Sequence, residues 1–87
     1  MNFNDHFVSS THRFSIGKET RTGRHYLSIP VSNGLVDYEE YYEITAQQSE
    51  HFTNDLPAAT SFAEKCRQRM RDHLLIIKPG TNRGIAI

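Results

Sequence analysis

Residues 23–44 constrain the fold of this chain more than any other stretch, because they read as two alternating segments joined by a turn. In residues 24–32 the apolar side chains recur at every second position, which is typical of a half-buried β-strand. Residues 36–45 repeat this alternation. Asn33-Gly34 lies between the two segments, and this pair is the strongest short signal for a tight turn. The sequence therefore predicts a two-stranded hairpin.

Two residues inside the hairpin break its pattern. Pro30 has no N–H to donate to a neighbouring strand, so either its strand lies at a sheet edge there or a bulge interrupts it. Glu40 falls in phase with Tyr38 and Tyr42 on the predicted core face, and a buried carboxylate is costly unless it is paired. We expect that a basic side chain meets Glu40 or that a bulge shifts the register.

The segments before the hairpin differ in character. Residues 13–18 alternate, so they predict a further strand, which a turn ending at Gly23 links to the hairpin. Residues 1–11 are polar and show no period. We expect this first segment to be an irregular arm.

The chain after the hairpin predicts two helices and a return to the sheet. Thr45 and Gln48 fit a capping box that begins a short helix over residues 46–53. Apolar residues at three- and four-residue spacings predict a long helix over residues 57–72. The apolar run 74–77 reads as a buried strand, and an extension of the helix is the alternative.

These elements predict one domain over residues 1–87, of class α+β. Its architecture is an antiparallel sheet of three to four strands, in the order β-β-β-α-α-β, with one long and one short helix packed on one face. Residues 78–87 form a turn-rich tail. A chain of this length buries little surface, which leaves a homodimer open.

Composition excludes several classes of protein. Ten basic and ten acidic residues give a net charge of zero, which argues against a general binder of nucleic acids or anionic membranes. The single cysteine cannot form an internal disulfide and favours a reducing compartment. The N-terminus does not read as a secretory signal, and no apolar run reaches the length of a membrane span. We therefore expect a cytoplasmic protein.

No group of residues indicates catalysis. The five histidines do not form the His-x-x-x-His spacing of a zinc site. Cys66 and His73 lie on one helical face, but two ligands do not make a site. Cys66 falls on the apolar stripe, as a core cysteine does. We expect no catalytic residue, no metal site and no cofactor.

An acidic strand face and a basic loop point to a protein partner. The second face of residues 36–45 combines carboxylates with an aromatic ring, which is typical of an interface, although a solvated face with cross-strand ion pairs is the plainer interpretation. The loop 78–84 combines two glycines with the basic residues Lys78 and Arg83 and can bind an acidic group; a plain turn is its alternative. The predicted partner-binding residues are Asp37, Glu39, Tyr41, Glu43, Lys78 and Arg83.

Three segments, residues 26–31, 36–42 and 74–84, resemble a small family of uncharacterised bacterial proteins. The resemblance spans most of residues 13–84. It implies a single-domain bacterial protein of the cytosol, and no known activity, cofactor or partner.

We therefore predict a small protein-binding module of the immunity or regulatory type. Neither a membrane nor a nucleic acid is expected as its partner. Two other functions stay open. A small-ligand binder or minor enzyme would form a cleft from His25, Tyr41, Glu43 and Arg83. A weak nucleic-acid binder would use Arg67, Arg71, Lys78 and Arg83.

Overall fold

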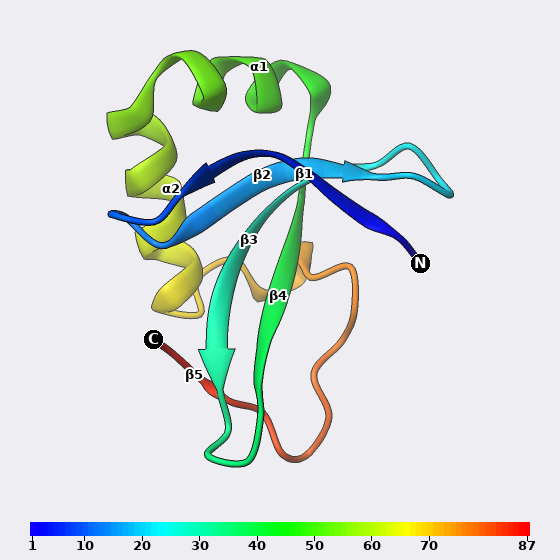
Figure 1. Ribbon diagram of the computed structural model, residues 1–87, viewed down its shortest axis with the longest axis vertical. Coiled ribbons are helices and arrows are strands. Elements are labelled where there is room, and N and C mark those ends of the chain that lie inside the picture. The colour runs from blue at the N-terminus through cyan, green and yellow to red at the C-terminus, as the bar shows by residue number, and fades with distance from the viewer.

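All 87 residues are described by the computed structural model (Figure 1). The chain begins with an antiparallel meander of β1 (Phe3–Ser9), β2 (Phe14–Glu19), β3 (His25–Ser32) and β4 (Asp37–Ile44). It continues with α1 (Ala46–Asn54), α2 (Leu56–Arg67), the 3₁₀ helix η1 (Asp72–Leu74) and β5 (Ile85–Ala86). The predicted α+β class with an antiparallel sheet is confirmed.

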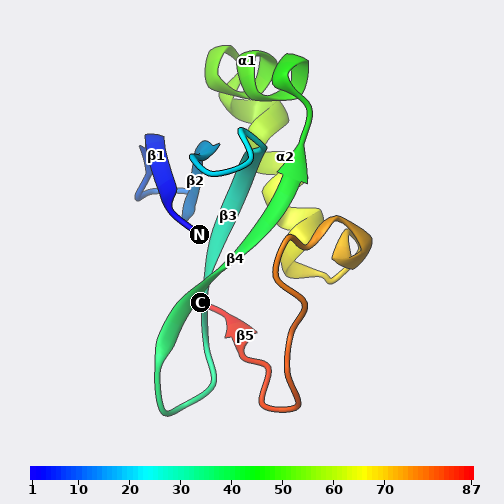
Figure 2. The same ribbon diagram turned by 90° about the vertical axis from the view of Figure 1, so that its right-hand side faces the viewer.

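The helices cover one face of the sheet, with α2 along its side and α1 across one end (Figure 2). Alternate residues of β2, β3 and β4 form the core with the inner sides of both helices. None of the helices has the length and apolar character needed to cross a membrane. The opposite face of the sheet, called the outer face below, carries Gly17, Tyr26, Ser28, Glu39 and Tyr41.

The first residues form a strand, so the prediction of an irregular arm over residues 1–11 is wrong. β1 pairs with β2, but its register shifts between Asp5 and Phe7. Such a bulge moves the side chains that follow it to the other face of the sheet. Phe3 and Asp5 therefore share the outer face, whereas Phe7 packs against the core. The bulge hides the two-residue period by which the strand would be recognised.

Gly17 allows β1 to close over the outer face. The ring of Tyr26 lies over this glycine, and a Cβ there would collide with the ring and with the backbone oxygen of Asn4. Tyr26 is fully buried, and its hydroxyl donates a hydrogen bond of 2.6 Å to the Asp5 carboxylate. Burial raises the pKa of Tyr26, and the hydrogen bond to Asp5 raises it further. The outer face thus has a small buried cluster of its own.

The starts of both helices follow local sequence signals. Thr45 and Gln48 form the predicted capping box, with the Gln48 N–H donating to the Thr45 hydroxyl at 3.0 Å and the Thr45 N–H donating to the Gln48 side chain at 2.9 Å. Asp55 caps α2 by accepting from the Ala58 N–H at 3.2 Å. These caps satisfy N–H groups that have no partner within the helix.

Helix α2 ends at Arg67, before the predicted end at residue 72. Arg69 has a φ of 61°, and this left-handed conformation stops the helix. The predicted strand over residues 74–77 is also wrong, as is a helix extension. The chain passes through η1, and only an isolated bridge joins Leu75 to Tyr42.

The strand that rejoins the sheet is β5, at the end of the segment expected to be a turn-rich tail. It pairs with β3 from Val31 onward, whereas the pairing of β2 with β3 ends at Ser28. Pro30 lies in the gap between these two neighbours, and its carbonyl accepts from the Ile87 N–H at 3.2 Å. β3 and β4 keep one register throughout, so no bulge accommodates the proline. The side of Pro30 that lacks an N–H therefore lies at a local edge of the sheet.

Candidate functional site

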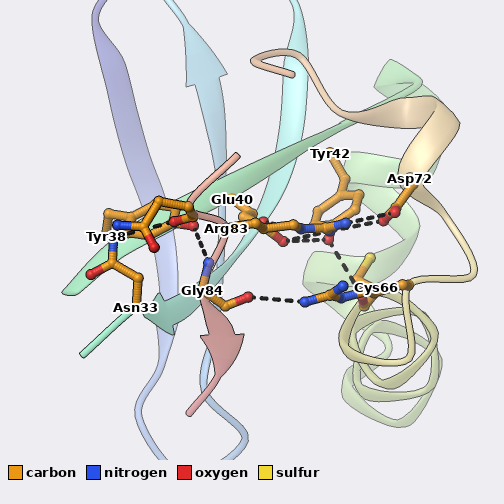
Figure 3. A network of polar contacts seen from close by, with 10 residues as sticks. Asn33, Tyr38, Glu40, Tyr42, Cys66, Asp72, Arg83 and Gly84 are labelled. Carbon is orange, nitrogen blue, oxygen red and sulfur yellow. Dashed lines mark hydrogen bonds and ion pairs between the residues drawn. The ribbon is translucent and has the colours of Figure 1, made fainter. Parts of the chain in front are cut away.

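A buried ionic network fixes the C-terminal segment to the sheet, and Figure 3 shows Arg83 between Glu40 and Asp72. The Arg83 guanidinium donates to Glu40 at 2.8 and 3.1 Å and to Asp72 at 2.7 and 2.9 Å. The Arg83 side chain is 13% exposed and that of Glu40 only 7%. Hydrogen bonding to Arg83 lowers the pKa of Asp72. The basic partner expected for Glu40 is therefore Arg83.

The network continues into the core through Tyr42. Its hydroxyl lies 2.9 Å from the Glu40 carboxylate and 3.3 Å from the backbone oxygen of Cys66. Cys66 is buried, and burial raises the pKa of its thiol to about 12. A thiol with such a pKa is not a nucleophile at neutral pH, and Cys66 serves as a core residue.

The loop formed by residues 77–82, called the anchored loop below, is held at both ends. Before it, the Ile76 N–H donates to the Tyr41 carbonyl at 2.9 Å. After it, the Gly84 N–H donates to the Tyr38 hydroxyl at 2.6 Å (Figure 3). A Cβ on Gly84 would collide with the backbone of Ser32. The loop therefore leaves the β4 edge at Ile76 and returns beside Tyr38.

A groove of about 670 Å³ lies between β4 and the anchored loop. The projecting end of the β3–β4 hairpin and the loop run side by side in both ribbon views. Glu39 and Tyr41 line the groove from the strand, and Ile77 and Lys78 line it from the loop. All residues of the anchored loop are exposed. The groove is thus an open slot beside the last strand of the meander.

The backbone of Glu39 points into this slot. The Asn33 N–H donates to the Val36 carbonyl at 3.2 Å. In an antiparallel pair this means that the backbone groups of Val36, and of every second residue after it, point toward β3. The backbone N–H and C=O groups of the residues between them point away from β3. The Tyr41 carbonyl is an example, because it accepts a hydrogen bond from the Ile76 N–H. Opposite Glu39 is Pro30, whose carbonyl also turns away from β4. The N–H and C=O of Glu39 therefore lie on the free edge of β4.

Tyr41 lies on the outer face of the sheet as alternation predicts, and there it belongs to an aromatic cluster. Its ring stacks on Phe3 with centroids 3.7 Å apart and an angle of 12° between the planes, and meets Tyr26 edge to face at 5.0 Å. Phe3 comes from β1, which is not a neighbour of β4 in the sheet. The sheet therefore curls until its first strand reaches its fourth across the outer face.

The carboxylate of Glu39 has no basic partner. Neither Glu39 nor Asp5 forms an ion pair. Burial raises the pKa of Glu39, and the negative charge of Asp5 raises it further, whereas the nearby hydroxyl of Ser28 lowers it. Ionised Glu39 is thus less stable here than in water, a condition common at functional sites.

The structure brings together part of the predicted partner-binding site. Glu39, Tyr41 and Lys78 line one groove. Glu43 lies outside it and is 4.0 Å from Arg24, which matches the plainer interpretation of a cross-strand ion pair. Arg83 is enclosed by carboxylates and offers no free charge to a partner. Asp37 is exposed at the start of β4.

The residues of the two other expected sites do not come together in this way. No cavity of the molecule is lined by more than one of His25, Tyr41, Glu43 and Arg83. On α2, the Arg67 guanidinium is bound to the backbone oxygens of His12 and Arg13. Arg67 and Arg83 therefore make contacts within the fold, whereas Arg71 and Lys78 form no ion pair.

Three contributors to the site were missed in the sequence. Phe3 and Asp5 belong to a strand disguised by its bulge, and Ile77 was placed in a buried strand although its side chain is exposed. The separation of Phe3 from Phe7 by four residues fits a bulged strand as well as a helical turn, and that was the available signal.

The site therefore combines a free strand edge, an anchored loop, an aromatic cluster and two unpaired carboxylates. The function of the site is inferred below from this geometry. The resemblance to a bacterial family stays a prediction. Comparisons with models of protein families, with curated proteins and with solved structures found no match to this chain.

Proposed function

We propose that this chain is a protein-binding module that takes an extended segment of a partner protein alongside β4. The segment would add a strand to the sheet within the groove between β4 and the anchored loop. In such recognition, main-chain hydrogen bonds provide affinity, and side-chain pockets on alternate sides provide specificity. Occupying a partner segment in this way is what an immunity or regulatory protein requires.

The observation that carries the proposal is the unpaired backbone of Glu39. An exposed strand edge invites association, and proteins normally cover such an edge or blunt it. Here a groove of about 670 Å³ separates the anchored loop from the edge. The buried Arg83 network and the bond from Ile76 to Tyr41 hold the loop in that position. The loop thereby shields the edge from pairing with the sheet of another molecule but leaves it open to a single extended chain.

Exposed apolar side chains gather around the same end of the molecule. Leu35 and Val36 lie at the tip of the β3–β4 hairpin, and Ile77 lies on the anchored loop. Ile85 and Ile87 follow in the C-terminal segment. Five of the nine exposed large apolar residues thus lie at this end of the molecule, and Ile77 lines the groove itself. Apolar surface around a polar slot is typical of a protein interaction site.

The test uses peptides selected on the full chain from a random library of peptides of about ten residues. Selected peptides should shift the NMR signals of the Glu39 and Tyr41 amides. Glu39→Pro removes an outward N–H and leaves the β3–β4 hydrogen bonds intact, because that N–H does not face β3. Loss of this bond should weaken binding by about tenfold. Glu39→Gln is the matched variant that keeps the N–H and should bind at least some of the peptides.

Two results would contradict the proposal. One is that the selected peptides shift signals only elsewhere, for example along α2, and bind Glu39→Pro as they bind the wild type. The other is that the chain associates with itself and Glu39→Pro abolishes that association. The second result would assign the β4 edge to another copy of this chain.

A further inference from the structure

Two carboxylates lie on the outer face of the sheet without an ion pair. Asp5 comes from β1 and Glu39 from β4, and the curl of the sheet that stacks Phe3 on Tyr41 brings these strands together. Asp5 accepts one hydrogen bond, from the Tyr26 hydroxyl, and Glu39 forms no ion pair. The other buried carboxylate of β4, Glu40, has its arginine. Glu39 therefore lacks the ion pair that the fold supplies to Glu40.

A second observation at this place is the hydroxyl of Ser28. Ser28 is 1% exposed, and its Oγ forms no hydrogen bond of normal geometry. It lies close enough to Glu39 to lower the pKa of that carboxyl. Buried hydroxyls are nearly always hydrogen-bonded in folded proteins, and the Ser28 hydroxyl, whose contact with Glu39 falls short of normal geometry, keeps the capacity to accept an N–H beside that carboxylate.

The place beside Glu39 can be reached from the proposed docking groove. Glu39 lines that groove and also a hollow of about 310 Å³ on the outer face, which Ser15 and Pro30 help to form. Arg13, the basic residue of this hollow, is exposed and forms no ion pair with Glu39. Side chains of an added strand alternate between the two faces of the sheet, so those on one side of it turn toward the hollow.

We propose that a basic side chain of the docked segment, arginine or lysine, binds beside Glu39 and Asp5. The inference depends on the proposed function, because it names the chemistry of the segment that β4 takes up. The cation supplies the missing charge for both carboxylates. Its N–H groups donate charge-assisted hydrogen bonds to the carboxylate of Glu39.

The test compares peptides selected from the random library on the wild-type chain with those selected on Glu39→Gln. Wild-type peptides should share an arginine or lysine at one position, and Glu39→Gln peptides should lack it. Replacing that residue by its neutral counterpart, citrulline for arginine or norleucine for lysine, should weaken wild-type binding by about tenfold or more. Glu39→Gln should bind both peptides equally. Glu50→Gln removes an exposed, unpaired carboxylate of α1 and should behave as wild type.

The outcomes separate this inference from the proposed function. Peptides that shift the Glu39 and Tyr41 amides but share no basic residue would overturn the inference and leave the docking edge standing. A basic preference that persists in Glu39→Gln would also overturn it. Peptides that do not shift those amides would overturn both.

Discussion

Glu39 and Glu40 are adjacent in sequence but lie on opposite faces of the sheet. Glu40 meets Arg83 in a nearly closed network, whereas Glu39 meets Asp5 and no cation. Of the two, Glu40 stabilises the fold through its pairing. Glu39 is the residue whose charge the fold does not compensate, and we assign it to binding.

At Arg83 we expect a large effect on stability. Arg83→Met leaves the buried Glu40 carboxylate unpaired, which should lower the free energy of unfolding by about 3 kcal/mol. The double variant Glu40→Met/Arg83→Met should recover a large part of this loss, because it leaves no buried charge without a partner. Urea unfolding measures both free energies.

Lys65→Met is the control, at an exposed position of α2 without an ion pair, and it should change stability by no more than about 0.5 kcal/mol. Equal effects of Arg83→Met and Lys65→Met would show that the network does not stabilise the fold.

At Glu39 the sign of the stability change is reversed. Its pKa is raised in the folded state, so protonation favours folding and the ionised carboxylate costs stability at neutral pH. Glu39→Gln should therefore raise the melting temperature at pH 7 by roughly 3 °C. The gain should shrink as the pH falls toward the unfolded pKa of about 4.3, because Glu39 is then protonated in both states. A lower melting temperature for Glu39→Gln at pH 7 would mean that the ionised carboxylate stabilises the fold.

At the scale of elements, β1 is what turns a flat antiparallel sheet into one with a second buried cluster. Its bulge between Asp5 and Phe7 places Phe7 on the core face, although Phe3 and Asp5, four and two residues before it, lie on the outer face. Gly17 has no Cβ, and this leaves space for the Tyr26 ring beneath β1. Without this close approach, Phe3 would not reach Tyr41.

Gly17→Ala tests this role of β1. The added Cβ collides with Tyr26 and with the β1 backbone, so the variant should lose about 2 kcal/mol of stability and release Phe3 from Tyr41. Urea unfolding and the NMR signals of the two rings measure these effects. Gly80→Ala is the control, because a Cβ there meets open space. Equal stability of the two variants would contradict the packing described for β1.

The elements that were predicted correctly are those whose signal is local. The hairpin followed from alternation and Asn33-Gly34, and α1 followed from its capping box. The ends and additions of the sheet depend on distant contacts. β5 is too short to show a period. It forms because it pairs with β3 beside Pro30, where β2 no longer does. Helix α2 ends early, at Arg67, and the left-handed residue that follows is Arg69 rather than a local breaker such as glycine.

The candidate site was predictable only in part, for the same reason. Alternation placed Glu39 and Tyr41 on one face, and the basic partner of Glu40 was anticipated from the cost of burying its charge. That Arg83 would be this partner is set by the path of the chain from α2 to β5. The role of Asp5 required the curl of the sheet, which no pattern within β1 reveals.

At the scale of the whole molecule, the helices cover one face of the sheet, β1 closes over the other, and the β4 edge beside the anchored loop stays open. At this edge Glu39 combines a backbone N–H and C=O that face away from β3 with a carboxylate that forms no ion pair. The central claim is therefore that this strand edge is unoccupied in the free protein and becomes paired on binding.

Hydrogen exchange of individual backbone amides, with and without a selected peptide, tests this claim most directly. In the free chain the Glu39 N–H should exchange quickly, whereas the Glu40 and Tyr42 N–H groups, which face β3, should be protected. Saturating peptide should protect Glu39 to a similar degree. An amide of Glu39 that is as protected as that of Glu40 in the free chain, or that gains no protection from bound peptide, would contradict the account.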